Sequence, residues 1–329
     1  MELNLNTFNH LGEETISLVE SCSEKKESGS FMRELSHRPV MLKEVLSMLN
    51  LKDGMVVVDC TLGLGGHASS IVERIVPHGW LIGIDKDEES LSVAKENLKK
   101  FSKNCLLIHD DFRNLDKTLE RHGIDGIDAV FLDLGVSSYQ LGSAARGFSF
   151  QAEGPLDMRM DRKGFISAYD LLNNLTEDEI SSILRKFGQE RFAHRIAHSL
   201  VKARQRGLIS STKELAELVL KVLPYKARFQ RIHPATRTFQ ALRIAVNREL
   251  DALDEALKKA ALFLNKGGRI CVVSYHSLED KIVKENFREF VKTERFQCVF
   301  KKILRPSREE IQENPRSRSA KMRVIERIR

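Results

Sequence analysis

The stretch VVVDCTLGLGGHA, residues 56–68, joins three consecutive valines to an aspartate and to a loop with three glycines in four positions. Consecutive β-branched residues favour a buried strand, and glycines directly after a strand let a ligand lie against the backbone. In open α/β sheets, nucleotides bind at this kind of strand-to-helix turn. The stretch therefore predicts a ligand site for a dinucleotide, a nucleoside triphosphate or another adenosine compound.

Strand-like and helical patterns alternate around this stretch, from residue 40 to residue 136. We expect strands at 55–59, 80–85, 105–109 and 129–134, and helices at 40–49, 68–75 and 88–101. This alternation is typical of βαβ units, so it predicts an α/β fold with a parallel sheet of buried strands.

A different pattern occupies residues 137–240, which hold glycine-punctuated loops and no good strand candidate. Helices are expected near 176–187, 190–206 and 212–223, then one helix over 238–264, a strand at 268–275 and antiparallel edge strands at 296–303 and 322–328. The simplest interpretation is a sheet domain made of residues 37–136 and 241–329, with an all-helical domain, 137–240, inserted into it. Such insertions attach at the carboxyl edge of the strands, where α/β sheets bind ligands.

Basic residues are concentrated in two parts of the chain. Residues 185–250 carry 15 basic and 4 acidic side chains, a net charge of +11, and residues 295–329 carry 11 and 4, a net of +7. Residues 37–160 carry 14 and 18, a net of −4. Dense basic clusters indicate a polyanionic partner, most often nucleic acid, and a solubilising surface is the alternative.

The first 36 residues are acidic, with a net charge of −4, and resemble neither a secretory signal nor a transit peptide. We expect a mostly disordered extension there. No apolar run reaches the ~20 residues that span a bilayer, so no membrane contact is expected. The five cysteines are scattered and never in a CxxC spacing, which favours a reducing cytoplasm and argues against a disulfide framework or a structural zinc site.

The residues around the glycine loop discriminate among its candidate ligands. A triphosphate-binding loop requires a lysine directly after its glycines. No lysine follows the glycines here, which excludes a nucleoside triphosphate. The dinucleotide fingerprint GxGxxA is met formally at 63–68, with Asp85 as the acid for the ribose. Asp59 favours a different ligand, because a carboxylate at the strand end repels pyrophosphate and attracts a cation. S-adenosylmethionine carries cationic sulfonium and ammonium groups, and Phe112 is placed to pack on its adenine. NAD is the alternative.

The fourth expected strand ends in FLDLGVSSYQ, residues 131–140. In doubly wound methyltransferases this strand end lies beside the methyl group and its acceptor. Enzymes that methylate exocyclic amino groups of bases commonly carry an Asp-Pro-Pro-aromatic stretch there. Asp133 stands where that acid would be, but Leu134, Gly135 and Val136 replace the rest, so the general pattern is matched only at its first residue.

Longer motifs resemble those of the MraW, or RsmH, family, and they occur in the family's order. They are HRPVML (37–42), GLGGH (63–67), DLGVSSYQL (133–141), RGFSF (146–150), GPLDMRMD (154–161), HPATRTFQALRI (233–244), SYHSLEDKIVK (274–284) and NPRSRSAKMR (314–323). The resemblance covers residues 37–329 and implies a Rossmann-like class I S-adenosylmethionine-dependent methyltransferase sheet with an inserted helical domain. The implied reaction is methylation of N4 of a cytidine in the decoding region of 16S ribosomal RNA, in the small ribosomal subunit.

Seven cofactor contacts are carried over from the family by this resemblance. They are Gly65, Gly66, His67, Asp85, Phe112, Asp133 and Gln140. Two neighbouring positions depart from the family's pattern. Tyr139 stands where many members have proline, and Tyr275 where many have phenylalanine.

Asp133 and His276 are the candidate catalytic residues. The amino nitrogen of cytosine is a poor nucleophile. The main catalytic contribution is therefore expected from positioning this nitrogen and the methyl group for direct in-line transfer. A carboxylate or carbonyl that accepts an N4 hydrogen would aim the lone pair at the methyl group. Asp133 is one such acceptor, and the carbonyls of residues 134–135 are another. His276 follows the fifth strand; because Ser277 and Asp280 fit a capping box, a histidine in a helix cap is the alternative.

Cysteine chemistry and a non-enzymatic role are the remaining alternatives. A C5-cytosine mechanism needs an attacking cysteine, usually beside a proline, and neither Cys60 nor Cys271 has that setting. We interpret both as packing residues. The non-enzymatic alternative is an RNA-binding ribosome-assembly factor with a vestigial cofactor site.

Six arginines are the candidate RNA-binding residues, five in the helical insertion and one just beyond it, toward the sheet domain. They are Arg191, Arg195, Arg228, Arg231, Arg237 and Arg243. Guanidinium groups suit phosphates and stack on unpaired bases. His194 and His198 have the spacing of metal ligands on a helix, but no third ligand is evident, so we interpret them as part of the basic helix and expect no metal.

Overall fold

The computed structural model describes residues 38–229 and 233–329. The acidic segment 1–36 and Arg231 lie outside the described residues. The chain divides into two compact units. The first comprises the chain up to Gly135 together with Leu253–Arg329, and the second comprises Val136–Ala252. The expected insertion, 137–240, starts one residue after the second unit begins. The second unit extends beyond residue 240, to Ala252.

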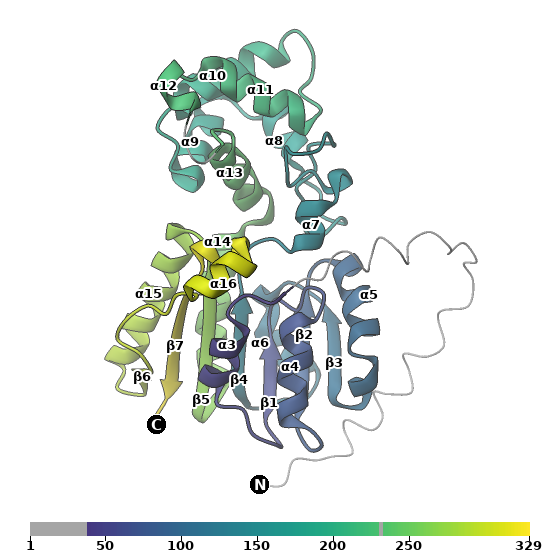
Figure 1. The fold of residues 1–329 in the computed structure, drawn as a ribbon, viewed down its shortest axis with the longest axis vertical. Helices are drawn as coiled ribbons and strands as arrows, with labels where there is room; N and C mark the ends of the chain where they lie inside the picture. The colour runs from purple at the N-terminus through teal and green to yellow at the C-terminus, as the bar shows by residue number, and fades with distance from the viewer. Residues whose placement is uncertain (1–37, 230–232) are drawn as a thin grey trace, which may run out of the picture. The chain divides into compact units, whose positions relative to one another are not determined.

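A seven-stranded sheet forms the first unit, with the order β3-β2-β1-β4-β5-β7-β6 (Figure 1). Its strands are β1 (Val56–Asp59), β2 (Trp80–Asp85), β3 (Cys105–His109), β4 (Ile127–Asp133), β5 (Leu264–Ser274), β6 (Phe296–Cys298) and β7 (Lys321–Arg327). The first five are parallel, and β7 runs antiparallel to both β5 and β6. The chain order reverses between β1 and β4, which is where α/β sheets open a ligand crevice. The predicted α/β, Rossmann-like sheet is confirmed.

The strand expected over 296–303 is wrong beyond Cys298. After Val299, whose N–H still donates to Val324, the chain leaves the sheet at the exposed residues Phe300, Lys301 and Lys302. Lysines at a sheet edge oppose further strand pairing.

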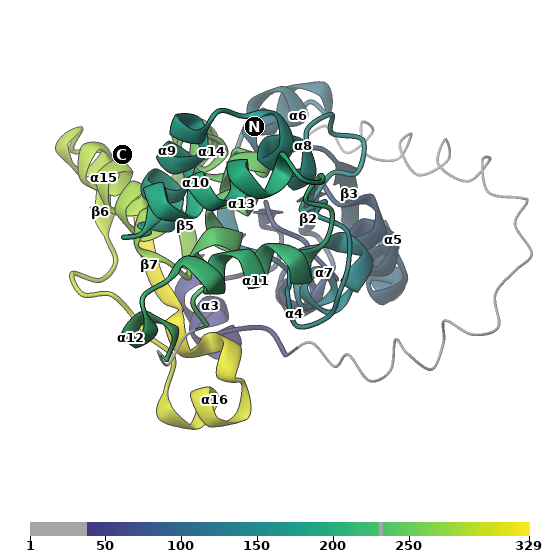
Figure 2. The same ribbon diagram turned by 90° about the horizontal axis from the view of Figure 1, so that it is seen from above.

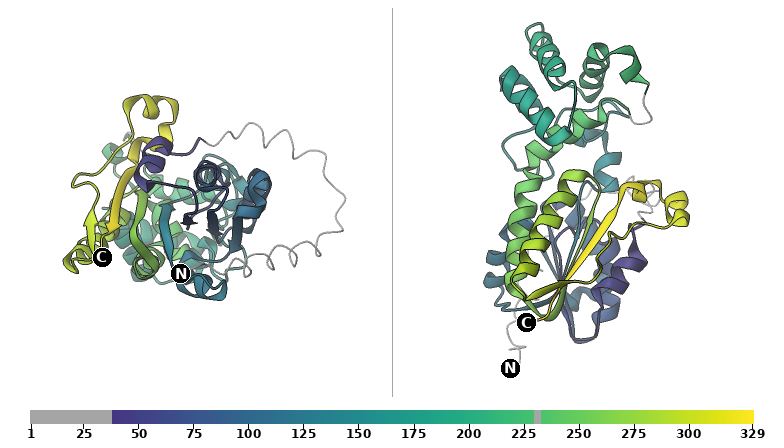
Figure 3. Two further views of the ribbon diagram at one scale, coloured as in Figure 1. Left: turned by 90° about the horizontal axis from the view of Figure 1, so that it is seen from below. Right: turned by 90° about the vertical axis from the view of Figure 1, so that its left-hand side faces the viewer.

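Side chains alternate along the buried strands and make a core on each face of the sheet. Val57 and Leu81 face one core, against α3 (Leu42–Leu49), α4 (Gly66–Ile75) and α5 (Glu88–Asn97). Val58 and Ile82 face the other, against α6 (Leu115–Arg121), α14 (Glu249–Phe263) and α15 (Ser277–Lys292). The right-hand view of Figure 3 shows the sheet between these two helix layers. The shorter elements of this unit are α16 (Arg308–Glu313) and the 3-10 turns η1 (Lys99–Asn104), η2 (Phe112–Asn114) and η4 (Pro315–Ser319).

Over its described residues, the regular elements of the second unit are helices (Figure 2), which pack around a core of their own. They are α7 (Ser138–Gly142), η3 (Ala144–Arg146), α8 (Ala168–Asn174), α9 (Glu177–Gly188), α10 (Ala193–Arg204), α11 (Thr212–Val222), α12 (Tyr225–Arg228) and α13 (Thr236–Asn247). α9 is packed against both α10 and α13. Among the described residues, no helix is long and apolar enough to cross a membrane.

The single helix expected over 238–264 is wrong, because the chain breaks it at Arg248. This residue has φ 50°, the left-handed conformation that ends helix α13 before α14 begins. Two side chains hold the break. Arg243 donates two hydrogen bonds to the carboxylate of Glu249, each of 2.9 Å, and the Asn247 amide donates to the carbonyl of Arg243.

Candidate functional site

The loop after β1 turns through two glycines with left-handed backbone, Gly63 with φ 54° and Gly65 with φ 82°. Side chains disfavour this conformation, which glycine adopts at no steric cost. Gly65 is the N-cap of α4, and Gly66 is its first residue. The first backbone N–H groups of a helix have no partner within the helix. The loop therefore places the amino end of α4 at the carboxyl edge of the sheet.

Asp85, the last residue of β2, ties this loop to the next strand. Its Oδ2 accepts from Gly63 N at 2.7 Å, and its Oδ1 accepts from Asp87 N at 2.8 Å. Burial of the carboxyl group raises the pKa of Asp85 to about 6, although these hydrogen bonds oppose the change.

Asp59, the last residue of β1, is almost fully buried and accepts a hydrogen bond of 3.0 Å from Thr61 N. Burial, with the neighbouring charges of Asp133 and Asp85, raises the pKa of Asp59 to about 7. Three carboxyl groups thus end three adjacent strands, and the charges of two of them disfavour ionisation of Asp59. A positively charged ligand would relieve this repulsion, whereas pyrophosphate would increase it.

Two side chains face the carboxylate of Asp133, the last residue of β4. The Tyr275 hydroxyl donates to its Oδ1 at 2.7 Å, and Nδ1 of His67 lies 3.6 Å from its Oδ2. The other ring nitrogen of His67, Nε2, lies 2.9 Å from the carbonyl oxygen of Val40. Because a carbonyl only accepts, Nε2 carries the hydrogen in the neutral ring. Burial lowers the pKa of His67 to about 4, so its Nδ1 presents a lone pair near neutral pH.

Of the seven expected cofactor residues, Gly65, Gly66, His67, Asp85 and Asp133 thus surround one strand edge. Phe112 follows β3 in η2, where it packs against the sheet core. The end of β3 adjoins Asp85, since Asp110 N donates to the carbonyl of Asp85 at 3.1 Å. Gln140 belongs to the second unit, where it is buried and makes a capping box with Ser137 at the start of α7. This cap was not predicted, although Ser-x-x-Gln at 137–140 is the sequence signature of a capping box.

His276 caps helix α15, and the expected capping box is displaced by one residue. Ser277 and Asp280 were expected to make it, but His276 and Glu279 do. The buried Glu279 carboxylate accepts from the backbone N–H groups of Tyr275 and His276, at 2.7 and 3.1 Å. Asp280 instead pairs with Arg323 of β7 at 2.8 Å, which removes it from the cap. The His276 side chain is 13% exposed and engaged with Glu279, so Asp133 is the better placed of the two catalytic candidates.

Cys60 and Cys271 are buried in the sheet core. Burial raises the pKa of both thiols, so neither is a thiolate near neutral pH. This agrees with the prediction that both are packing residues.

The arginines expected to bind RNA divide into two groups. Arg191 and Arg195 are exposed at the start of α10, and neither forms an ion pair with a described residue. Arg228 donates to the carbonyls of Leu223 and Lys221 at the end of α11, and Arg237 donates to the carbonyl of Gln189. Arg243 is paired with Glu249 at the helix break described above.

His194 and His198 have a third partner that the sequence spacing did not reveal. Glu177 of the neighbouring helix α9 lies 3.2 Å from Nδ1 of His194 and 3.0 Å from Nδ1 of His198. Both imidazoles are largely exposed. Over the described ranges, no group of three or more His, Cys, Asp or Glu side chains is arranged to hold a metal ion.

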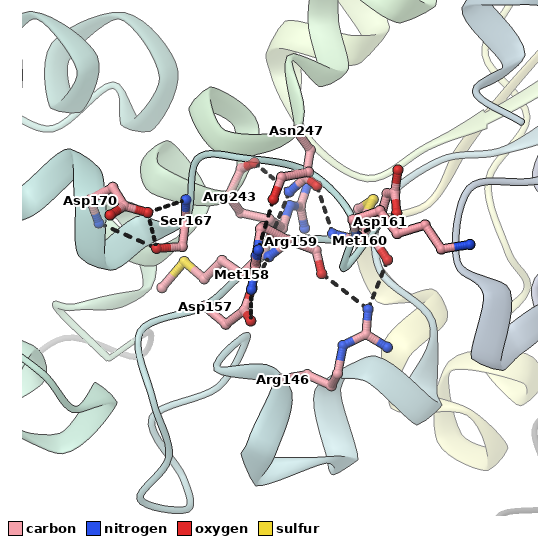
Figure 4. Close-up of polar contacts among 12 residues, drawn as sticks. Arg146, Asp157, Met158, Arg159, Met160, Asp161, Ser167, Asp170, Arg243 and Asn247 are labelled. Atoms are coloured by element: carbon pink, nitrogen blue, oxygen red, sulfur yellow. Dashed lines mark hydrogen bonds and ion pairs between the residues drawn. The ribbon is translucent and has the colours of Figure 1, made fainter.

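Two of the long motifs, RGFSF and GPLDMRMD, hold the second unit together (Figure 4). Buried Arg146 donates to the carbonyls of Arg159 and Met160, at 3.0 and 2.9 Å. Asn247 closes the same loop, because its amide donates to the carbonyl of Met158 and accepts from Met160 N, each at 2.8 Å. Met158 is fully buried with φ 60°, a strained conformation that these contacts maintain.

An exposed aromatic pair in the second unit was not predicted. Tyr225 and Phe229 are 75% and 72% exposed, and their ring centroids are 4.8 Å apart. The basic residues Lys226 and Arg228 lie between them in sequence, and both are exposed. The alternation of basic and aromatic residues in YKARF was the available signal.

Known proteins resemble this chain over almost all of the described residues. The MraW methylase family matches residues 34–328. A protein of Clostridium botulinum (strain 657 / Type Ba4), named ribosomal RNA small subunit methyltransferase H, is 44% identical over 311 residues, which are 90% of this chain and all of that one. Proteins of the same name from Clostridioides difficile (strain 630) and Geobacter sp. (strain M21) are 43% and 46% identical, again over 90% of this chain and all of theirs.

Among solved structures, a putative rRNA methylase from Clostridium thermocellum aligns over 88% of this chain and 98% of its own, with 15% identity and a TM-score of 0.43. The match at 43–46% identity over the full length of several relatives carries the assignment. Together with the family match over residues 34–328, it shows that this chain belongs to the MraW methylase family.

Proposed function

We propose that this protein transfers a methyl group from S-adenosylmethionine to the N4 amino group of a cytidine in the 16S RNA of the small ribosomal subunit. Family membership supports the reaction class, and the names of the relatives support the small-subunit RNA as substrate. The N4 position follows from the motif resemblance. A cytoplasmic location follows from this substrate.

The observation that carries the proposal is the arrangement of Asp59, Asp85 and Asp133 around the glycine loop. Burial and mutual repulsion raise the pKa of Asp59 and leave the strand edge short of positive charge. S-adenosylmethionine supplies cationic groups there, and the same edge would repel the pyrophosphate of NAD. The residues present therefore fit the methyl donor better than the dinucleotide.

Each residue has a role in holding the donor. We expect Gly65, Gly66 and His67 to offer the amino end of α4 to the carboxylate of the methionine part, since helix amino ends attract anions. Asp85 would accept from the ribose hydroxyls, and Phe112 would pack on the adenine. The remaining two contacts expected from the resemblance are Asp133 and Gln140.

Asp133 is proposed to orient the acceptor. The N4 lone pair forms the new bond to carbon as the carbon–sulfur bond breaks and its electron pair stays on sulfur. The nitrogen then passes one proton to water. A carboxylate that accepts an N4 hydrogen keeps the lone pair aimed at the methyl group and stabilises the positive charge on nitrogen. Asp133 is suited to this because Tyr275 fixes one of its oxygens in advance.

The second unit is proposed to bind the RNA. Its exposed Arg191 and Arg195 offer charge for phosphates, and the exposed Tyr225 and Phe229 rings offer a stacking surface for unpaired bases. The target cytidine must leave its stack before its amino group can reach the donor.

Methyl transfer to isolated small subunits tests the proposal. Subunits from cells that lack the enzyme would be incubated with labelled donor, and the RNA digested to nucleosides for mass analysis. The expected product is N4-methylcytidine. A C5-methylated product, another base or no incorporation would contradict it. Calorimetry with S-adenosylhomocysteine and with NAD shows which of the two ligands the site binds. Binding of RNA without methyl transfer would favour an RNA-binding assembly factor.

A further inference from the structure

Residues 299–320 form a lobe of the first unit, between β6 and β7, that contains α16 and η4. Six basic side chains lie within it, and all are exposed. They are Lys301, Lys302, Arg305, Arg308, Arg316 and Arg318. None of the six forms an ion pair or hydrogen bond with a described residue. In the neighbouring strands, by contrast, Arg269 and Arg323 are paired with acids.

Two of the three acidic residues of the lobe contact the segment before α3, and the third, Glu309, is exposed. Glu310 accepts a hydrogen bond of 2.6 Å from Met41 N, and Glu313 is paired with Arg38. Asn314 donates to the carbonyl of Arg38 at 3.1 Å. These contacts attach the lobe to the segment that leads into α3, and they use two of its three acids. The outer surface is left with unpaired positive charge.

The topology places this lobe at the carboxyl edge of the sheet. β7 is antiparallel to β5, so its first residue, Lys321, lies opposite the last residue of β5, Ser274. Tyr275 comes next along the chain and donates to Asp133. Figure 1 shows α16 at this end of the strands.

We infer that this lobe is a second RNA-binding surface, on the methyltransferase unit itself, which holds backbone phosphates of the ribosomal RNA beside the donor site. This rests on the proposed function. Clustered, unpaired arginines and lysines bind phosphates and release counterions, so binding depends steeply on salt. The acceptor nucleotide must reach Asp133, and its flanking phosphates then pass the same sheet edge. The lobe positions the RNA at this edge and carries no base specificity.

Two triple variants of the full chain test the inference. One is Lys301→Gln/Lys302→Gln/Arg305→Gln, and the other is Arg308→Gln/Arg316→Gln/Arg318→Gln. The matched control is Lys52→Gln/Lys103→Gln/Lys266→Gln, whose exposed lysines lie at the opposite, amino edge of the sheet and also lack ion pairs with described residues. All three lose the same charge. Binding of 16S RNA would be measured from 50 to 300 mM salt, with KM for small subunits and calorimetry of S-adenosylhomocysteine alongside.

Each lobe variant is expected to weaken RNA binding and raise KM for subunits about tenfold. The slope of log K against log salt should fall by about 2, since each lost phosphate contact is worth about 0.7–0.9. Affinity for S-adenosylhomocysteine should stay within about twofold, because none of the seven proposed donor contacts lies within residues 299–320. RNA affinity of the lobe variants equal to that of the control overturns the inference, and so does a parallel loss of donor binding. RNA affinity tests the lobe even if the protein transfers no methyl group. Absence of methyl transfer would refute the proposed function and leave the inference about the lobe to the RNA-binding result.

Discussion

The hydroxyl of Tyr275, at the end of β5, donates a hydrogen bond of 2.7 Å to Oδ1 of Asp133, at the end of β4. Nδ1 of His67 lies 3.6 Å from the other oxygen of the same carboxylate. Tyr275 therefore fixes one oxygen of Asp133, whereas near neutral pH the Nδ1 lone pair of His67 faces the other.

Tyr275→Phe should weaken the site without abolishing it. Loss of a hydrogen bond to a charged group costs ~1.5–3 kcal/mol, of which Asp133 recovers part from its other contacts. We expect the free energy of unfolding to fall by about 1 kcal/mol and donor affinity to fall about threefold to tenfold. Denaturant unfolding and calorimetry measure these changes. Tyr225→Phe is the matched control, since that side chain is exposed, and it should change neither quantity.

Asp133→Ala should remove methyl transfer. If Asp133 accepts an N4 hydrogen of the acceptor, the variant loses about 10²–10³ in kcat even when donor is saturating. If Asp133 serves only the donor, KM for the donor rises and kcat recovers at high concentration. Initial rates over a range of donor concentrations separate the two cases, and near-normal kcat at saturation refutes the role in orienting the acceptor.

Donor binding should weaken as the pH falls. A cationic ligand favours the ionised forms of Asp59 and Asp85, whose pKa values are about 7 and about 6. Protons therefore compete with the donor below pH 7. We expect Kd for S-adenosylmethionine to rise on the order of tenfold from pH 7.5 to 5.5. S-adenosylhomocysteine lacks the sulfonium charge and should show a smaller change. Equal pH dependence of the two ligands would contradict this electrostatic account.

Asp59→Asn should stabilise the protein, and more so at high pH. The folded pKa of Asp59 is raised from 3.8 to about 7, so the unfolded chain loses this proton first as the pH rises. Between these values the ionised group makes folding progressively less favourable, and the penalty is complete above pH 7. Asparagine keeps an oxygen for Thr61 N but cannot ionise. The gain in Tm over the wild type should be larger at pH 8 than at pH 5, without ligand.

The parallel sheet was predictable because each of its parallel strands contains an apolar run directly before a polar last residue. Asp59 and Asp85 therefore identified the carboxyl edge before any contact was known. The helix break at Arg248 was not predictable. Its neighbours 238–247 and 249–263 continue a helical pattern, and the break depends on Asn247 bonding to the distant Met158 carbonyl.

The same limit applies to the site. A hydroxyl at position 275 is visible in the sequence, but its bond to Asp133 joins residues 142 positions apart. Glu177 lies on a different helix from His194 and His198, so their spacing alone carried no information about it. Arginines were predictable as a basic cluster, whereas their division into exposed and paired members depends on which carbonyls and carboxylates the fold brings near them.

The division into exposed and paired arginines predicts that one set of variants affects RNA binding and the other affects folding stability. Arg191→Gln/Arg195→Gln removes exposed charges, so it should leave Tm unchanged, weaken RNA binding and reduce the salt slope by about 1 to 2. Arg243→Gln leaves Glu249 without its bidentate partner at a site where both side chains are at least 85% buried, so it should cost ~3 kcal/mol of folding free energy. Thermal unfolding and filter binding of 16S RNA measure both quantities. Unchanged RNA affinity in the first variant would remove Arg191 and Arg195 from the RNA-binding surface, while an unchanged Tm for Arg243→Gln would show that the pair does not stabilise the helix break.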